Sequence, residues 1–291
     1  MEVIELAIPI LVFFLMFVIG ASLEKSDLYG VKTQSNKVLI LTLGQILLLP
    51  LCAWIIIKLM QPAPLVAGGM LLVSLCPGGA VSNIYSFLAR ANVALSITLT
   101  AFNGLVAVFM LPLFMVSVFP TLSSVDLVVE SLVIKQALQL VLLLLFPVVL
   151  GMVLRHWKPV FIKQVMPIFE KVGGLGLLLL LVTILATFQQ KIAEQLSSLI
   201  LLAFVFTLTS IFIAYSLARL LKLCLGDEAA VVIEFPVRNL ALAALIAVNL
   251  FQNSDYLLFA AIFFVIQTPI MLGITAWYRG KLATNKSSLT F

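Results

Sequence analysis

The chain has 291 residues, of which 63% are hydrophobic and only 10% are charged, and its mean hydropathy is +1.25. Ordinary soluble domains carry about 25% charged residues. A chain with so little charge cannot cover a water-facing surface, which excludes a soluble enzyme, a disordered chain and a disulfide scaffold. The net charge of +5 does not indicate a nucleic-acid partner, because the basic residues form no patch with aromatic neighbours.

Apolar stretches bounded by charges and turn residues predict an all-α polytopic membrane protein, because about 20 apolar residues in a helix span a bilayer. Nine spans are expected, at residues 3–23, 38–60, 65–89, 92–118, 131–154, 165–188, 197–221, 228–251 and 256–278. No long polar segment separates them. We therefore expect a single membrane domain over residues 1–291, integral to the plasma (inner) membrane.

Basic residues gather in alternate connections of this predicted bundle. The connections after the odd-numbered spans hold Lys25, Lys32, Lys37, Arg90, Arg155, Lys158, Lys163, Arg219, Lys222, Arg279, Lys281 and Lys286. The opposite connections hold only Lys58, Lys135 and Lys191, together with the acids Glu2, Glu5, Asp126, Glu130, Glu194 and Asp255. By the positive-inside rule, the N-terminus is expected outside and the C-terminus in the cytoplasm.

Two spans are interrupted near their middle. The third contains Pro77, Gly78 and Gly79, and the eighth contains Glu234, Pro236, Arg238 and Asn239. Unwound backbone at membrane depth is tolerated only where it is buried in protein or lines a cavity. Ionisable residues at that depth indicate a functional site.

The positions of the two breaks predict an inverted repeat, because the interrupted spans are antiparallel and five spans apart. Spans five to nine would form one repeat, and spans one to four a first repeat that lacks its opening helix. The two broken helices would cross near the midplane. Their half-helix N-termini would then face one point and attract an anion.

Oxygen-bearing side chains surround the breaks. Ser96 and Thr100 are spaced i and i+4, so their hydroxyls share one helical face. With Ser82, Asn83 and Glu234 they offer a carboxylate, an amide carbonyl and three hydroxyls, the oxygen ligands that hard cations prefer. Hydrogen bonding between helices is the alternative role for the hydroxyls.

The stretch CPGGAVSNIYSFLARANVALSITLT resembles the bile acid:sodium symporter family, as do EFPVRNLALAALIAV and the opening LMFVIGASLEKSDLYG. The likeness covers nearly the whole chain. It implies a core domain with two crossing discontinuous helices, a smaller panel domain and the nine-helix form of the family. It also implies a secondary active transporter, and no enzyme, that couples Na⁺ to the uptake of an organic anion by alternating access.

The same resemblance implies the positions of two sodium sites. The first would consist of Ser82, Asn83, Ser96, Thr100 and Glu234. The second would use Glu234 again, Gln45, the backbone carbonyls of Phe235 and Val237, and a glutamine where this chain has Arg238.

Arg238 departs from the family pattern in a way that bears on mechanism. A guanidinium stays protonated and cannot coordinate a cation. Our hypothesis is that Arg238 occupies the second site as a built-in positive charge, which leaves one sodium ion, or none if Arg238 also neutralises Glu234. The alternative is that Arg238 faces the cavity and pairs with an anionic substrate.

The substrate is expected at the crossing, beside Asn83 and Asn239. Further candidates for its binding site are Arg238, Gln267, Thr268 and Ala80, where the family often has threonine. The expected partners are a small organic anion and the lipid bilayer, with no nucleic acid and no obligate protein partner. A sodium-independent or proton-coupled organic anion carrier is the competing hypothesis. An intramembrane enzyme would need a nucleophile–base pair or metal ligands at depth, and the sequence offers neither.

Overall fold

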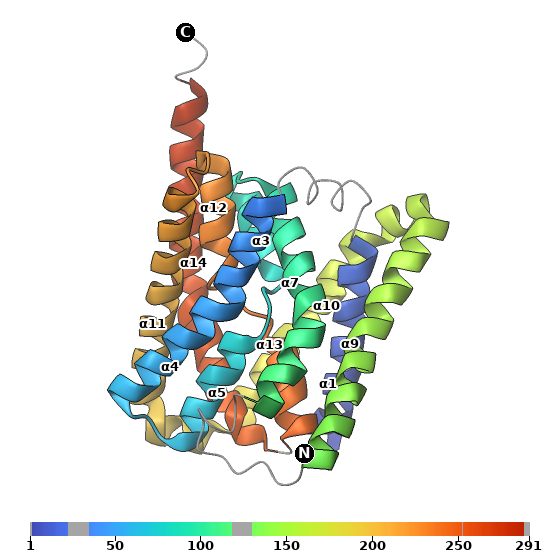
Figure 1. Cartoon of the computed structure of the whole chain (residues 1–291), viewed down its shortest axis with the longest axis vertical. Coiled ribbons are helices and arrows are strands. Elements are labelled where there is room, and N and C mark those ends of the chain that lie inside the picture. The colour runs from blue at the N-terminus through green and yellow to red at the C-terminus, as the bar shows by residue number, and fades with distance from the viewer. Residues whose placement is uncertain (1, 23–34, 118–129, 252, 288–291) are drawn as a thin grey trace.

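The computed structural model describes residues 2–22, 35–117, 130–251 and 253–287 (Figure 1). The elements up to the middle of the chain are α1 (Glu2–Ser22), α3 (Ser35–Leu43), the π-helical turn η1 (Gly44–Leu48), α4 (Leu49–Met60), α5 (Pro64–Leu75), α6 (Val81–Ala89) and α7 (Val93–Ser117). The remaining elements are α9 (Glu130–Trp157), α10 (Pro159–Thr187), α11 (Gln189–Leu220), α12 (Leu225–Glu234), α13 (Leu240–Leu245), η2 (Ile246–Leu250), η3 (Ser254–Tyr256) and α14 (Leu257–Ser287).

Each predicted span coincides with helix in the described part of the chain. The last residues of the spans at 3–23 and 92–118 lie outside the described residues. Four stretches are long and apolar enough to cross a membrane, namely Asn36–Met60, Pro159–Thr187, Gln189–Leu220 and Ser254–Thr284. Shorter apolar helices include Pro64–Leu75, which is the first half of an interrupted span.

Three helices form the panel side of the molecule. Helix α1 packs along both α9 and α10, and α1 and α9 run side by side in Figure 1. The backbones of α1 and α9 approach closely at Gly20, where an added Cβ would lie 2.0 Å from the carbonyl oxygen of Val148. Small residues at such contacts are how membrane helices associate, because lipid gives no hydrophobic driving force between them.

The core side holds the interrupted helices between regular ones. Helix α11 packs on α14 and α12, and α14 also contacts α5 and α6. Fully buried aromatic side chains fill this region, with the ring of Phe206 5.6 Å from that of Phe263 and the ring of Phe259 stacked on Phe263 at 5.8 Å. The fold is therefore an all-α bundle of a core and a panel.

The two interrupted helices cross at their breaks, as predicted. The segment between α5 and α6 pairs with the segment between α12 and α13 through an antiparallel bridge of Gly78 and Arg238. The Gly79 N–H donates to the Val237 carbonyl and the Asn239 N–H to the Pro77 carbonyl, both at 2.9 Å. These bonds satisfy backbone N–H and C=O groups that have no partner within a helix. At membrane depth such groups must be paired inside the protein, because lipid offers no hydrogen bonds.

Gly78 and Gly79 are needed at the crossing for space. None of the described glycines has a positive φ, so backbone freedom does not explain them. A Cβ at Gly78 would lie 2.1 Å from Oε1 of Glu234, and a Cβ at Gly79 would lie 2.8 Å from the Arg238 carbonyl oxygen. Any larger side chain would therefore push the two broken helices apart.

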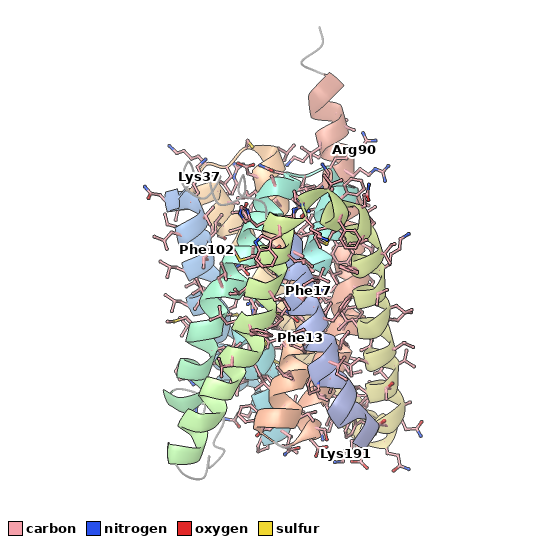
Figure 2. The ribbon with its side chains drawn as sticks, turned by 90° about the vertical axis from the view of Figure 1, so that its right-hand side faces the viewer. Phe13, Phe17, Lys37, Arg90, Phe102 and Lys191 are labelled. Carbon is pink, nitrogen blue, oxygen red and sulfur yellow. The ribbon has the colours of Figure 1, made fainter. Side chains whose placement is uncertain are left out.

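Basic side chains mark both ends of the bundle. Figure 2 places Lys37 and Arg90 at one end and Lys191 at the other. The N-terminus of α1 and the C-terminal end of α14 also lie at opposite ends (Figure 1). We call the end with Lys37 and Arg90 the basic end.

Candidate functional site

A buried carboxylate is the centre of the site. Glu234 is the last residue of α12 and is fully buried. The Ser82 hydroxyl, from the first turn of α6, donates to its Oε2. From α7, the Thr100 hydroxyl lies 2.8 Å from Oε1 and the Ser96 hydroxyl lies 3.3 Å from Oε2.

Asn83 completes the arrangement. Its Oδ1 accepts from the Ser96 hydroxyl at 2.8 Å and lies 3.3 Å from that of Thr100. The structure thus brings together all five side chains expected at the first cation site, and we call Ser82, Asn83, Ser96, Thr100 and Glu234 the polar cluster. Ser86 was not predicted from the sequence, and its hydroxyl donates to Ser96 Oγ at 3.1 Å. Its i+4 spacing from Ser82 was the available signal.

A second polar contact anchors the start of α7 next to α12. The Asn92 backbone N–H donates to the Gly226 carbonyl at 3.0 Å, and the Asn92 side chain donates to Asp227 Oδ1 at 2.8 Å. The Asn92 side-chain oxygen accepts from the Leu95 N–H at 3.1 Å. These bonds fix the register of α7, and so the position of its two hydroxyls, against the helix that carries Glu234.

The guanidinium of Arg238 is enclosed by neutral oxygens. Its Nη1 donates to Gln45 Oε1 at 2.8 Å and lies 3.3 Å from the Phe235 carbonyl. Its Nη2 donates to the Cys76 carbonyl and lies 3.4 Å from that of Ser74. None of these four oxygens belongs to Glu234, so Arg238 acts on that carboxylate only through space.

The residues expected at the second cation site lie partly around Arg238 and partly in the crossing. Gln45 and the Phe235 carbonyl face Arg238, as ligands of a cation would. The Val237 carbonyl instead accepts from Gly79 in the crossing bridge. The alternative that Arg238 reaches out for a substrate is disfavoured, because the residue is only 4% exposed and both Nη atoms are bonded inside the core.

A small cavity of about 10 Å³ lies beside Arg238, which is room for one water molecule. Arg238 Nε, Gln45 Nε2 and both side-chain atoms of Asn103 are buried without a partner in the described residues, and all three side chains line this cavity. Asn103 was not predicted from the sequence as a residue of this region. It lies three residues after Thr100, and so on the same face of α7.

A larger cavity of about 430 Å³ separates the crossing from the panel helices. Five of the six residues predicted to contact substrate line it, namely Ala80, Asn83, Arg238, Asn239 and Gln267. Thr100 of the polar cluster lines it as well. The polar cluster and the large cavity therefore share Asn83 and Thr100 as a common wall.

Thr268, the sixth of these residues, is not among the described residues that line the cavity, and its hydroxyl donates to the Phe264 carbonyl one turn earlier in α14 at 2.7 Å. Adjacent residues of a helix point about 100° apart, so the wall takes Gln267 and not its neighbour. Asn239 caps α13 by accepting from the Leu242 N–H at 3.1 Å, which leaves its NH₂ group to offer to a ligand.

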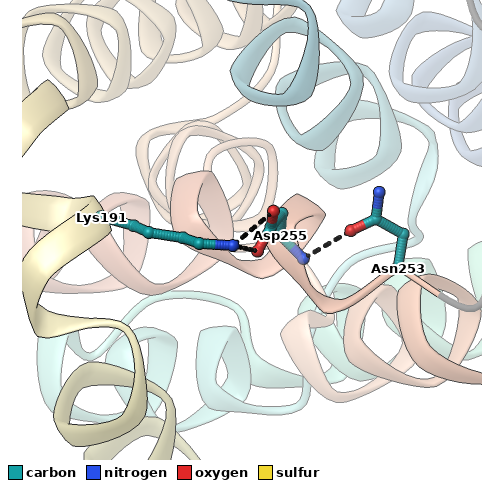
Figure 3. Close-up of polar contacts among 3 residues, drawn as sticks. All are labelled: Lys191, Asn253 and Asp255. Carbon is teal, nitrogen blue, oxygen red and sulfur yellow. Dashed lines mark hydrogen bonds and ion pairs between the residues drawn. The ribbon is translucent and has the colours of Figure 1, made fainter.

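The cavity extends toward the basic end, because its wall includes Ser22, Phe87 and Val93 near the ends of α1, α6 and the start of α7. Beyond the crossing, apolar residues of α10, α13 and α14 leave only about 20 Å³ between them. At that far end Lys191 donates to both carboxylate oxygens of Asp255, at 2.6 and 2.8 Å (Figure 3). Lys191 is half exposed, so this pair contributes about 0–1 kcal/mol.

The fold and the site indicate a polytopic membrane transport protein. The features that indicate this class are two crossing interrupted helices, a buried carboxylate among hydroxyls and a cavity beside them. The chain belongs to the Sodium Bile acid symporter family, whose model matches residues 9–198. It is 28% identical over 238 residues to an Arabidopsis thaliana protein named "Probable sodium/metabolite cotransporter BASS1, chloroplastic", which covers 82% of this chain and 58% of that protein. This relative is named as a transporter and not as an enzyme.

Bacterial and animal proteins are also similar. The "Uncharacterized sodium-dependent transporter YocS" of Bacillus subtilis is 26% identical over 243 residues, which cover 82% of this chain and 73% of that protein. A Bos taurus "Sodium-dependent organic anion transporter" is 36% identical over 99 residues, which cover 34% of this chain and 26% of that protein. The chain spans less than two thirds of the length of the plant relatives it matches.

Proposed function

We propose that this protein is a secondary active transporter that couples the movement of an organic anion to Na⁺. The observation that carries the proposal is the shared wall: Asn83 and Thr100 belong to the polar cluster and also line the large cavity. An ion that reorganises these two side chains changes the surface that a substrate meets. Such coupling is reciprocal, so the substrate also raises the affinity for the ion.

The polar cluster suits a hard monovalent cation. It presents a carboxylate, an amide oxygen and three hydroxyls, and oxygen-only sets favour hard cations over zinc or copper. In this structure the hydroxyls of Ser82 and Thr100 donate to Glu234. A bound Na⁺ would take the carboxylate oxygens in their place and turn the hydroxyl oxygens toward itself.

The position of Arg238 favours the coupling of one sodium ion and not two. Its guanidinium already supplies positive charge to Gln45 Oε1 and to the carbonyls of Phe235 and Cys76. A second cation there would meet a fixed like charge in a medium of low dielectric, where repulsion is strong. In this proposal the crossing holds one mobile sodium ion and one tethered cation, which is the guanidinium of Arg238.

The cavity suits an anion with an apolar body. Arg238 is the one charged residue on its described wall, with its guanidinium turned into the core, and the other polar groups there are amides and hydroxyls. The N-terminus of α6 begins at Val81 on the same wall, and helix N-termini favour anions. A carboxylate or sulfonate would bind beside Asn83 and Asn239, with its body between α1, α6 and α10.

Transport would follow from movement of the panel against the core. The inverted repeat, with spans one to four as the incomplete copy, would provide two related conformations about the fixed crossing. We place the basic end in the cytoplasm of the plasma (inner) membrane, by the positive-inside rule. The structure then has the large cavity extending inward, with the outer side closed by apolar contacts.

A proton-coupled or sodium-independent carrier is the second candidate. The hydroxyls of Ser82 and Thr100 bond directly to both oxygens of Glu234, and such a site can hold a proton in place of a sodium ion. Arg238 also lowers the need for a mobile cation near Glu234.

Flux measurements separate the candidates. Purified protein in proteoliposomes would be supplied with a panel of labelled carboxylates and sulfonates, under an inward Na⁺ gradient, a proton gradient, or equal K⁺ on both sides. Uptake above the K⁺ level only with the Na⁺ gradient supports the proposal. Uptake driven by the proton gradient alone, or unaffected by either gradient, overturns sodium coupling and supports the second candidate.

A further inference from the structure

Three glycines lie close together in α10, and they have different surroundings. A Cβ at Gly173 would lie 2.7 Å from the Leu15 side chain, and a Cβ at Gly176 would lie 2.6 Å from that of Leu11. Both positions therefore face α1, where small residues permit close packing. A Cβ at Gly174 would meet nothing within 4 Å.

Gly174 is exposed, and the open space beside it borders the large cavity. Gly174 lines this cavity together with Leu177, one turn further along α10. Across the cavity the wall is formed by the crossing and by apolar residues of α6 and α7, including Ile84 and Ile97. At Gly174 the panel thus presents bare backbone to the space that the substrate body would occupy.

Helix packing gives no reason for glycine at this position. Glycine in a helix interior is less favourable than alanine by about 1 kcal/mol, and nothing around Gly174 forbids a side chain. The feature that a side chain would remove is cavity width. A leucine here would project into the space beside the crossing, because a helical side chain extends from the surface on which its Cα lies.

We propose that Gly174 determines the width of the anion that the cavity accepts. Its missing side chain makes room for a wide, rigid apolar body beside the crossing, while the anionic group binds near Asn83 and Asn239. This inference rests on the organic-anion transport proposed above and adds the residue that selects the shape of the substrate.

The test uses three sulfonates of increasing width, namely hexane-1-sulfonate, naphthalene-2-sulfonate and pyrene-1-sulfonate. Each stays ionised and so does not cross the bilayer unaided. In proteoliposomes, Gly174→Leu should lower uptake of pyrene-1-sulfonate by about tenfold or more, the effect of steric exclusion from an apolar pocket. Uptake of hexane-1-sulfonate should change by less than about twofold. Gly174→Ala should change both only slightly.

Gly104→Leu is the matched control. Gly104 lies in α7, also has nothing within 4 Å of an added Cβ, and lies outside the described cavity walls. It should leave the uptake of all three sulfonates unchanged. Equal loss of all three in Gly174→Leu, or loss already in Gly174→Ala, would show that this glycine serves folding or helix bending and would overturn the proposal.

A second measurement keeps the test independent of the substrate. In a background with Cys52, Cys76 and Cys224 replaced by alanine, Gly174→Cys should react with a charged methanethiosulfonate reagent, and Gly104→Cys should not. No reaction at position 174 would overturn the placement of Gly174 on the cavity. Reaction at 174 without uptake of any sulfonate by the wild type would instead count against organic-anion transport, while cavity access at Gly174 would stand.

Discussion

At the scale of the residue, the proposed cation site depends on Glu234. It is fully buried and surrounded by hydroxyls of two other helices. A buried carboxylate of this kind persists when a bound cation or a set of hydrogen bonds compensates its charge. Its neutral isostere would keep the shape and much of the hydrogen bonding and lose the charge.

Glu234→Gln should therefore abolish stabilisation by Na⁺. For the wild type, Na⁺ at about 100 times its Kd should add about 2.7 kcal/mol relative to K⁺ at equal ionic strength. Thermal unfolding of the detergent-solubilised protein measures this. Glu228→Gln is the control, since Glu228 is buried in the same helix and bonds to Tyr278 at 3.0 Å, outside the polar cluster. A Na⁺ response retained in Glu234→Gln would contradict the assigned site.

Arg238→Gln should raise the number of sodium ions that bind. Removing the guanidinium leaves Gln45 Oε1 and the carbonyls of Phe235 and Cys76 without their donor, and these oxygens can then accept a cation. The Hill coefficient for Na⁺-dependent uptake should rise from about 1 toward about 2.

Arg238→Lys should keep the coefficient of the wild type, because the tethered charge remains. Arg219→Gln, which removes an exposed arginine at the end of α11, controls for the loss of net charge. An unchanged coefficient in Arg238→Gln would rule out the tethered-cation hypothesis.

At the scale of the element, the crossing depends on close contact of two backbones. Gly79→Ala would place a methyl group 2.8 Å from the Arg238 carbonyl oxygen, and neither backbone can yield without breaking the bridge. The expected destabilisation is about 1–3 kcal/mol, or a fall in Tm of roughly 2–4 °C for each kcal/mol.

The same substitution at Gly273 is the matched control. This glycine lies within α14, and nothing lies within 4 Å of an added Cβ. Alanine there should leave Tm unchanged or raise it slightly, because alanine favours helix. If both substitutions changed Tm equally, the crowding at Gly79 would have no energetic consequence.

The sequence predicted where the helices lie and where they break better than it predicted which face of each helix meets the cavity. The Pro77–Gly79 segment and Glu234 mark the two breaks, because Pro-Gly-Gly and a carboxylate are each exceptional within an apolar run, whereas single prolines such as Pro147 and Pro269 lie inside continuous helices. The polar cluster followed from the i, i+4 spacing on α7 and from the family resemblance. Asn103 and Ser86 were not predicted, and Thr268 lies outside the described cavity wall, because the face of a helix that meets a cavity depends on packing against other helices, which the local sequence pattern does not contain.

At the scale of the whole molecule, the orientation in the membrane can be tested with a native residue. Cys224 is exposed in the connection between α11 and α12 at the basic end, whereas Cys52 and Cys76 are buried. A membrane-impermeant maleimide should label Cys224 in inverted membrane vesicles and not in intact cells.

Cys224→Ser should abolish the labelling, which shows that the signal comes from this residue. Labelling of intact cells with the same efficiency as inverted vesicles would place the basic end outside the cell. The large cavity would then extend outward, and the structure would represent the opposite half of the transport cycle.

The contact between Ser82 and Glu234 joins residues 152 positions apart, and this has a consequence for biogenesis. During synthesis the hydroxyls of α6 and α7 enter the bilayer long before their carboxylate is translated. Until α12 is inserted they have no charged partner, and the crossing has no second strand. The core therefore cannot complete its assembly before Glu234 has been translated and α12 has been inserted, however well the earlier helices have inserted.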